Sequence, residues 1–181
     1  RSYEEELASI PQFLDKADTT FHGLMGKMRR LTREYDLSLT VSGDTVTLKG
    51  SERNKRRLLS GLLYHESASA FTSTDSLQAA FPSIDIDKIR ADVMDVLNEN
   101  HYFINDYSLL NLLLHIAIAI NRVQNGCVYT EAPSNMHPLD PQNEKLAQEL
   151  TERLARNFGI RFSAAEQYEM AEQSFKKSMR W

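Results

Sequence analysis

The sequence predicts a mainly α-helical protein that begins with a small unit containing a β-hairpin and continues as a bundle of helices. Apolar residues recur at helical spacing over most of the chain, and only residues 37–48 alternate in the way of strands. The 181 residues include only 7 glycines and 5 prolines, too few for a loop-rich or disordered chain. We therefore expect a helix–helix–hairpin unit over residues 1–50 and a helical bundle over residues 51–181.

The N-terminal unit is predicted to hold two helices, one over residues 3–15 and a second that begins near Asp18 or Thr19. One face of the second helix is apolar, with residues at spacings of three and four: Phe21, Leu24, Met25, Met28 and Leu31. The rest of its surface is basic, with Lys27, Arg29, Arg30 and Arg33. Two short alternating stretches follow, and Gly43-Asp44 between them is suited to a two-residue hairpin turn.

A helix with a basic outer face followed by a hairpin is the plan of a winged helix-turn-helix, in which the second helix enters the major groove and the hairpin forms the wing. We expect residues 1–50 to hold only the last part of such a unit. The four basic residues are therefore candidate DNA contacts, and a solvated charged face is the alternative interpretation.

After Gly50 every element reads as helix. The first is capped by Ser51 and runs to about Ser67, and "FTSTDSLQAAFPSI" holds a short one. Asp85 caps a helix with the inner face Ile86, Ile89, Val93, Val96 and Leu97, and Asn105 caps the next, which ends before Gly126. Asp140 and Pro141 begin a helix that stops at Gly159. Ser163 and Glu166 form a capping box for the last helix, which is expected to bury Tyr168, Ala171 and Phe175.

The helix after Asn105 is the most apolar stretch of the chain, yet it carries one narrow polar seam. At 100° per residue, Ser108, Asn111, His115 and Arg122 fall within a sector of about 60°. An unsatisfied polar group in a buried helix costs about 1–3 kcal/mol, so the alignment indicates a polar network or a cleft. Neutral imidazole is a nucleophile and a guanidinium holds phosphate oxygens, so His115 with Arg122 and Asn111 suits phosphoryl acceptance. The alternative is a structural histidine hydrogen-bonded to Asn111.

Composition and motifs exclude several classes of protein. The net charge of -4 argues against a dedicated nucleic-acid binder, and the sequence lacks GxGxxG, P-loop, CxxC and HExxH motifs. No histidine pair has metal-ligand spacing, so we expect no enzyme, no cofactor and no metal. The longest apolar run is too short for a bilayer, the N-terminus does not read as a signal peptide, and the single Cys127 permits no internal disulfide. We expect a cytoplasmic protein without membrane insertion. Because the chain begins with Arg1, we expect a fragment of a longer protein.

Three stretches resemble a known family. "TVTLKGSERNKRRLLSGLL" resembles the segment by which bacterial sugar-operon activators leave a helix-turn-helix domain. "YFINDYSLLNLLLHIAIAINRVQNG" resembles the histidine helix of the phosphotransferase-system regulation domain (PRD), and "NEKLAQELTERLARNFGIRFSAAEQYEMA" resembles its closing pair of helices. The chain thus resembles PRD-containing regulators of the BglG-type antiterminator and activator family from about Leu37 to Phe175.

The resemblance implies a regulator of sugar-utilisation genes. In this family, PRD bundles form dimers, and phosphocarrier proteins or sugar permease components of the phosphotransferase system phosphorylate their histidines. Phosphorylation then changes dimerisation and the activity of an attached DNA- or RNA-binding domain. His115 matches the first family histidine. The second is expected seven residues after the acidic residue, here Glu166, and that position is Gln173.

Several functions remain open at this point. The first is a phosphorylation-responsive domain of a DNA-binding transcription activator, acting as a homodimer and reaching DNA through the full-length protein. The second is a helical phosphotransfer protein, which needs an exposed histidine. The third is a structural dimerisation module whose histidine is inactive, an interpretation that Gln173 supports. The fourth is direct DNA binding by this chain itself.

Overall fold

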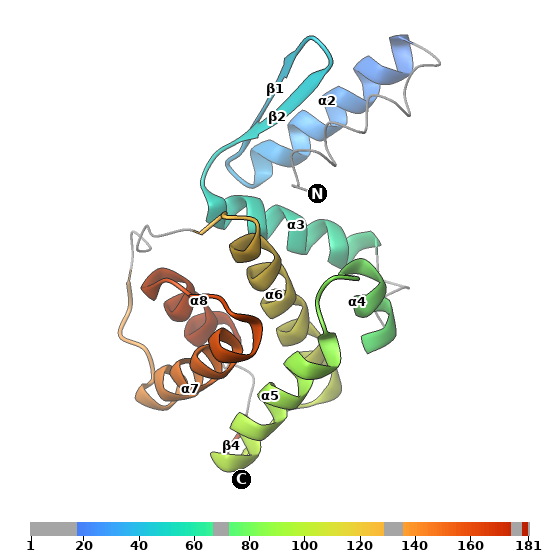
Figure 1. Ribbon diagram of the computed structural model, residues 1–181. Helices are drawn as coiled ribbons and strands as arrows, with labels where there is room; N and C mark the ends of the chain where they lie inside the picture. Colours follow the sequence, from blue (N-terminus) through green and yellow to red (C-terminus); the bar gives the residue numbers. More distant parts are fainter. Residues whose placement is uncertain (1–17, 67–72, 129–135, 175–178, 181) are drawn as a thin grey trace. The chain divides into compact units, whose positions relative to one another are not determined.

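The structure is a computed structural model that describes residues 18–66, 73–128, 136–174 and 179–180. It is mainly α-helical with a short antiparallel hairpin, as the sequence predicted (Figure 1). The chain divides into two compact units, residues 1–61 and residues 62–181. The predicted helix over residues 3–15 lies outside the described residues.

The first unit places one helix against the hairpin. Helix α2 (Asp18–Glu34) packs on strand β1 (Ser38–Ser42), which pairs with β2 (Thr45–Lys49). The register places Ser42 opposite Thr45, so Gly43-Asp44 is the two-residue turn, and Gly43 has the positive φ of 59° that such a turn uses. The hairpin predicted from the alternating pattern is thereby confirmed. Its core is apolar: Met25, Leu37, Leu39, Val46 and Leu48.

Helix α3 (Glu52–Glu66) begins after Ser51, whose Oγ accepts a hydrogen bond from the Asn54 N–H at 3.2 Å. Glycine is unfavourable within a helix, and Gly61 has a local reason to be there. A Cβ at residue 61 would collide with the hydroxyl of Tyr35, the residue that follows α2. The Arg57 guanidinium, one turn earlier, lies 5.8 Å from the centre of the Tyr35 ring. Tyr35 therefore holds α3 against the end of α2.

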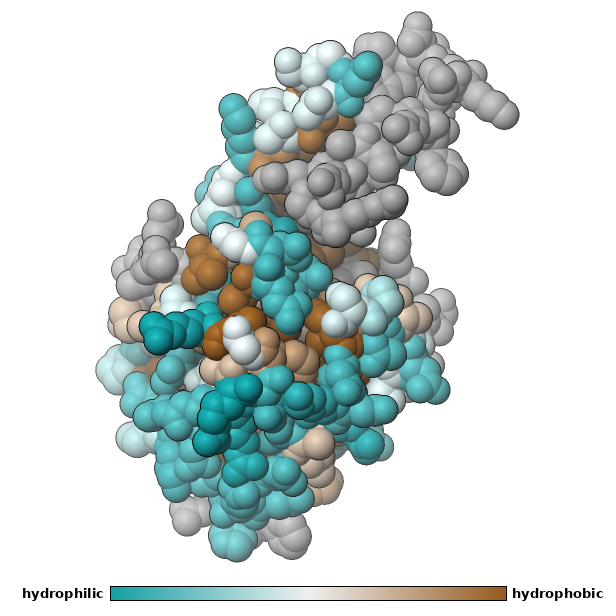
Figure 2. All heavy atoms as spheres, in the orientation of Figure 1, coloured by the Kyte–Doolittle hydropathy of each residue, from teal (hydrophilic) through white to brown (hydrophobic). Residues whose placement is uncertain are grey.

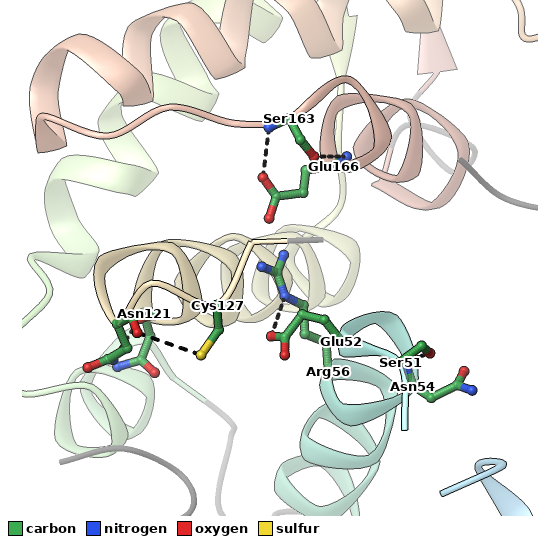
Figure 3. Close-up of polar contacts among 9 residues, drawn as sticks. Ser51, Glu52, Asn54, Arg56, Asn121, Cys127, Ser163 and Glu166 are labelled. Carbon is green, nitrogen blue, oxygen red and sulfur yellow. Dashed lines mark hydrogen bonds and ion pairs between the residues drawn. The ribbon is translucent and has the colours of Figure 1, made fainter. Parts of the chain in front are cut away.

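The second unit consists of helices with capped N-termini, and the caps Asp85, Asn105 and Asp140 were predicted from the sequence. Each cap oxygen accepts a backbone N–H: Ser73 at α4 (Thr74–Ala80), Asp85 at α5 (Ile86–Glu99), Asn105 at α6 (Asp106–Gln124) and Asp140 at α7 (Pro141–Phe158). At α8 (Ala164–Ser174), Ser163 N–H donates to Glu166 Oε2 at 2.8 Å, and Glu166 N–H donates to Ser163 Oγ at 3.1 Å (Figure 3). This is the predicted capping box, and it leaves the Glu166 side chain buried.

Helix α6 lies at the centre of this unit, packed against α5 and α8, and α7 packs on both of those helices (Figure 1). The inner face predicted for α5 is buried at each of its five positions, and so are Tyr168 and Ala171 of α8. Phe175 lies outside the described residues. The expectation of helix alone after Gly50 omitted one short pairing, between β3 (Tyr102–Phe103) and β4 (Met179–Arg180).

Polar side chains join α5 to α7 along their outer edge. The Asn157 side-chain amide donates to both carboxylate oxygens of Asp92, at 2.8 and 2.7 Å, and Lys88 donates to the Asn157 carbonyl at 2.9 Å. Further along, Arg153 pairs with Asp95 and Glu99, and the Asn100 amide donates to Glu149. The face drawn in Figure 2 is mostly hydrophilic over these two helices. The antiparallel α5–α7 contact is thus apolar inside and polar at its edge.

Candidate functional site

Helix α6 is a rigid support for the candidate histidine. Its N-cap Asn105 accepts the Ser108 N–H at 2.8 Å, and Gly126 follows its end with a φ of 75°. Leu113, Ile116, Ala117 and Ile120 are fully buried and fix the helix in the bundle core. His115 lies between these residues in sequence, so its backbone has little freedom to move.

The predicted polar seam is not uniform in depth. Ser108 and Arg122, at its two ends, are buried, with 6% and 4% of their surface exposed. Asn111 and His115, in its middle, are partly exposed. The structure therefore brings Asn111 and His115 to the protein surface and keeps the other two inside.

Helix α6 also carries a row of exposed residues that the sequence did not predict. Residues at successive four-residue steps are all partly or largely exposed: Tyr107, Asn111, His115, Ala119 and Val123. We name these five residues the α6 row. His115 is its midpoint, and the 58% exposed Tyr107 stands at its N-terminal end. Apart from His115, no residue of the row can carry a charge near neutral pH. Ala119 and Val123 are as apolar as the core residues, so the hydropathy of the sequence does not distinguish this exposed row from the buried faces of α6.

The environment of His115 favours the neutral imidazole. Among the residues that the structure describes, no hydrogen-bond partner of the ring is found, so the bond to Asn111 that the alternative, structural interpretation of His115 requires is not formed. Burial lowers the pKa of the His115 imidazole below its ordinary value of 6.5. A neutral ring with an unoccupied nitrogen lone pair is a nucleophile near neutral pH.

Helix geometry decides which neighbour is nearer to His115. Side chains lean toward the N-terminus of a helix, so His115 leans toward Asn111, one turn before it. Arg122 is two turns away, about 10 Å along the axis at 1.5 Å per residue, although its side chain leans toward His115. Asn111 is therefore the neighbour on α6 that is better placed to meet a group bound to the ring.

The remaining histidines with described side chains differ from His115. His101 is exposed in the left-handed conformation, with a φ of 59°. His137 is also exposed, and its backbone N–H donates to the Tyr168 hydroxyl at 3.0 Å. Gln173 lies in the last turn of α8, and its side chain is outside the described residues. Within the described ranges, no group of three His, Cys, Asp or Glu residues is arranged to hold a metal ion.

The four candidate DNA contacts lie together on α2 in the first unit. Lys27, Arg29, Arg30 and Arg33 are all exposed, whereas Met25 and Thr32 of the same helix are buried. The hairpin beside α2 buries Leu39, Val46 and Leu48 and exposes its turn and the outer side of β1. The helix-and-hairpin arrangement predicted for this region is present.

Comparison with known protein families identifies a PRD domain in the chain. Residues 93–173 match the model of the PRD domain, from within α5 to the last turn of α8. The match includes the whole of α6 with His115 and does not include α2 or the hairpin. No curated protein matches the chain. Among the described residues, no helix has both the length and the apolar character needed to cross a membrane.

Proposed function

We propose, from the premise that the chain contains a PRD domain, that it is the regulatory part of a bacterial transcriptional activator of sugar-utilisation genes. PRD domains are regulatory and belong to phosphotransferase-system control in general. In this proposal His115 accepts a phosphoryl group from the phosphocarrier protein or from a sugar permease component, in the cytoplasm. Phosphorylation changes the association of two copies of the chain and so the DNA binding of the whole activator.

The observation that carries the proposal is the state of His115. His115 is partly exposed on a helix whose other flank is fully buried, and the lowered pKa of its imidazole keeps it neutral. A phosphoryl donor needs such a nitrogen: reachable from outside, uncharged and fixed in position. A histidine kept only for packing has no need of an exposed edge.

A phosphate on His115 would change the charge of the α6 row. It adds about 1.5 to 2 negative charges to a surface that has no other charged side chain. If the α6 row lies in a symmetric contact between two copies, the two phosphates face each other and repel. Asn111 is the residue proposed to hold a phosphate oxygen, and Arg122 supports it from two turns away.

The DNA-binding part of the proposal rests on the first unit. An exposed basic helix packed beside a hairpin is the arrangement of a recognition helix and wing. Lys27, Arg29, Arg30 and Arg33 are the proposed contacts. The full-length activator would carry the complete DNA-binding domain.

Two other functions predict different behaviour of the same histidine. A phosphotransfer protein passes its phosphate to a second protein, for which the partial burial of His115 is unfavourable. A structural dimerisation module would leave His115 unmodified, and Gln173 at the second expected position favours that interpretation.

The test is phosphorylation by purified components. The chain is incubated with phosphoenolpyruvate, enzyme I and the phosphocarrier protein, with and without the matching permease component, and phosphate is mapped by mass spectrometry under conditions that preserve phosphohistidine. We expect phosphate on His115 that is lost in His115→Ala and retained in His101→Ala, a matched exposed histidine. Ultracentrifugation of both forms then measures association. Absence of phosphate on His115 with every donor would leave the structural module as the better account, and rapid transfer to an acceptor protein would favour the relay.

A further inference from the structure

We propose that Phe103 and Tyr107, two exposed aromatic residues at the N-terminal end of α6, are the docking point of the phosphocarrier protein that brings a phosphoryl group to His115. We name these two residues the aromatic pair. The inference rests on the proposed phosphorylation of His115 and adds where the donor binds and which side chains hold it.

The aromatic pair lies at the surface and not in the core. Phe103 and Tyr107 have 54% and 58% of their surface exposed, and they are the two aromatic residues among the large apolar side chains that the structure describes as exposed. Phe103 lies in β3, two residues before the N-cap Asn105, and Tyr107 lies in the first turn of α6. Aromatic residues are enriched in protein–protein interfaces and among the residues that dominate binding energy. The aromatic pair is therefore suited to contact another protein.

The α6 row connects the aromatic pair to His115. Tyr107 begins the row, and Asn111 is the row residue that stands between Tyr107 and His115. Tyr107 is eight residues from His115 on the same helix, which is about 12 Å along the axis. A transient interface of about 500 Å² on each partner extends roughly 13 Å from its centre. A donor whose reactive side chain meets His115 can therefore reach the aromatic pair in the same complex.

The shape of the α6 row favours a transient donor over a permanent second copy. The row crosses α6 obliquely, by about 40° for each step of four residues, and Leu112 on one side and Ile118 on the other are buried. From Tyr107 to Val123 it is about 24 Å long and about 10 Å wide, on the order of 240 Å². A stable interface covers about 800 Å² on each partner, and transient signalling contacts are smaller. A strip of this size fits the smaller class.

The lack of charge along the α6 row indicates which donor it suits. Interfaces that select one partner commonly use complementary charges. Apart from His115, no residue of the row can carry a charge near neutral pH. A contact made through two rings and small apolar side chains demands little of its partner. It therefore suits a general phosphocarrier that serves many acceptor proteins better than a permease component that is specific for one sugar.

The two ends of the α6 row differ, and this difference gives the direction of approach. Tyr107 and Val123 are each eight residues from His115, in opposite directions along the helix. The rings lie at the N-terminal end, whereas the C-terminal end holds only the smaller Ala119 and Val123. We therefore place the donor over the N-terminal half of α6 and assign little of its binding to the other half.

Single-turnover phosphorylation of Phe103→Ala and Tyr107→Ala, alone and combined, tests this placement. The chain is mixed with a varied excess of phosphorylated phosphocarrier protein, and phosphate on His115 is followed in time by mass spectrometry. We expect the half-saturating donor concentration to rise about tenfold in the double variant, while the limiting rate changes by less than about twofold. The melting temperature should change by less than about 3 °C, because both side chains are exposed.

Two further variants are matched controls. Tyr107→Phe keeps the ring, so its half-saturating donor concentration should equal that of the unchanged chain. Val123→Ala truncates a partly exposed side chain at the same distance from His115 on the other side, and should change that concentration by less than about twofold.

The outcomes separate this inference from the proposed function. If His115 accepts no phosphate from any donor, both fail. If His115 is phosphorylated and the double variant has an unchanged half-saturating concentration, or Val123→Ala raises it equally, the proposed function stands and the docking inference is wrong. Phosphorylation by the permease component alone would also overturn the inference. Ultracentrifugation adds one more outcome: loss of association in the double variant, with phosphorylation unchanged, would assign the aromatic pair to a contact between two copies of the chain.

Discussion

The hydrogen bond between Asn157 and Asp92 offers a quantitative test of what joins α5 to α7. Asn157→Ala removes the amide that donates to both carboxylate oxygens of Asp92. The contact between Lys88 and the Asn157 carbonyl remains, because that carbonyl belongs to the backbone. The substitution therefore isolates one side-chain interaction between the two helices.

The expected cost follows from the charge and burial of Asp92. Hydrogen bonds to charged groups contribute about 1.5–3 kcal/mol each, and Asp92 is only 8% exposed, so water replaces the lost amide incompletely. We expect Asn157→Ala to lower the free energy of unfolding by about 2 kcal/mol. In a domain of this size that corresponds to a melting temperature lower by about 4–8 °C.

The assay is a double-mutant cycle by urea unfolding, followed by circular dichroism and by fluorescence to establish whether the two signals coincide. Asp92→Ala should cost much less in the Asn157→Ala background than alone. Asn98→Ala, at an exposed asparagine of α5, is the matched control and should change stability by less than about 0.5 kcal/mol. A coupling energy below about 0.5 kcal/mol would refute the reasoning, since the two side chains would then contribute independently.

Three further changes have expected outcomes of different sign. His101→Gly should raise the free energy of unfolding by about 0.5–1 kcal/mol in urea titrations, because the φ of 59° favours glycine; a loss would mean that the imidazole makes a stabilising contact. Leu113→Ala, at a fully buried site on α6, should cost about 2–5 kcal/mol, and the partly exposed Leu110→Ala clearly less; equal costs would contradict the packing described. Stability should fall as pH drops below 6.5, because the unfolded chain binds a proton that the partly buried His115 of the folded chain resists; the same titration of His115→Gln should be flatter, and identical profiles would exclude this linkage.

Much of the fold could be predicted because its signals are local. Asp85, Asn105, Asp140 and Ser163 each cap the helix that follows, and each needs only backbone groups within three residues. The β3–β4 pairing could not be found, since it joins two residues on each side that are distant in sequence and carry no alternating pattern. Residues next to a helix end therefore specify where that helix begins, whereas a pairing such as β3–β4 depends on contacts between residues that are distant in sequence.

The candidate site was predictable in part for the same reason. The helical spacing placed His115 and Arg122 in one sector, and both do lie on α6. The exposure of these two side chains was not predictable. Other elements of the fold cover Arg122 and leave His115 partly exposed, and the helical spacing carries no information about which side chain is covered. The roles of His115, Asn111 and Arg122 stay predictions, as do those of the basic residues of α2.

The contact between Tyr35 and Gly61 has a consequence for how sequences of this kind can diverge. The phenol hydroxyl occupies the space that any side chain at position 61 would need. In a related chain with alanine there, the side chain at position 35 must be shorter or must turn away from its place here. An alignment of such relatives should therefore show the two positions changing together, and a mismatched pair would mark a chain in which α3 leaves the hairpin by a different path.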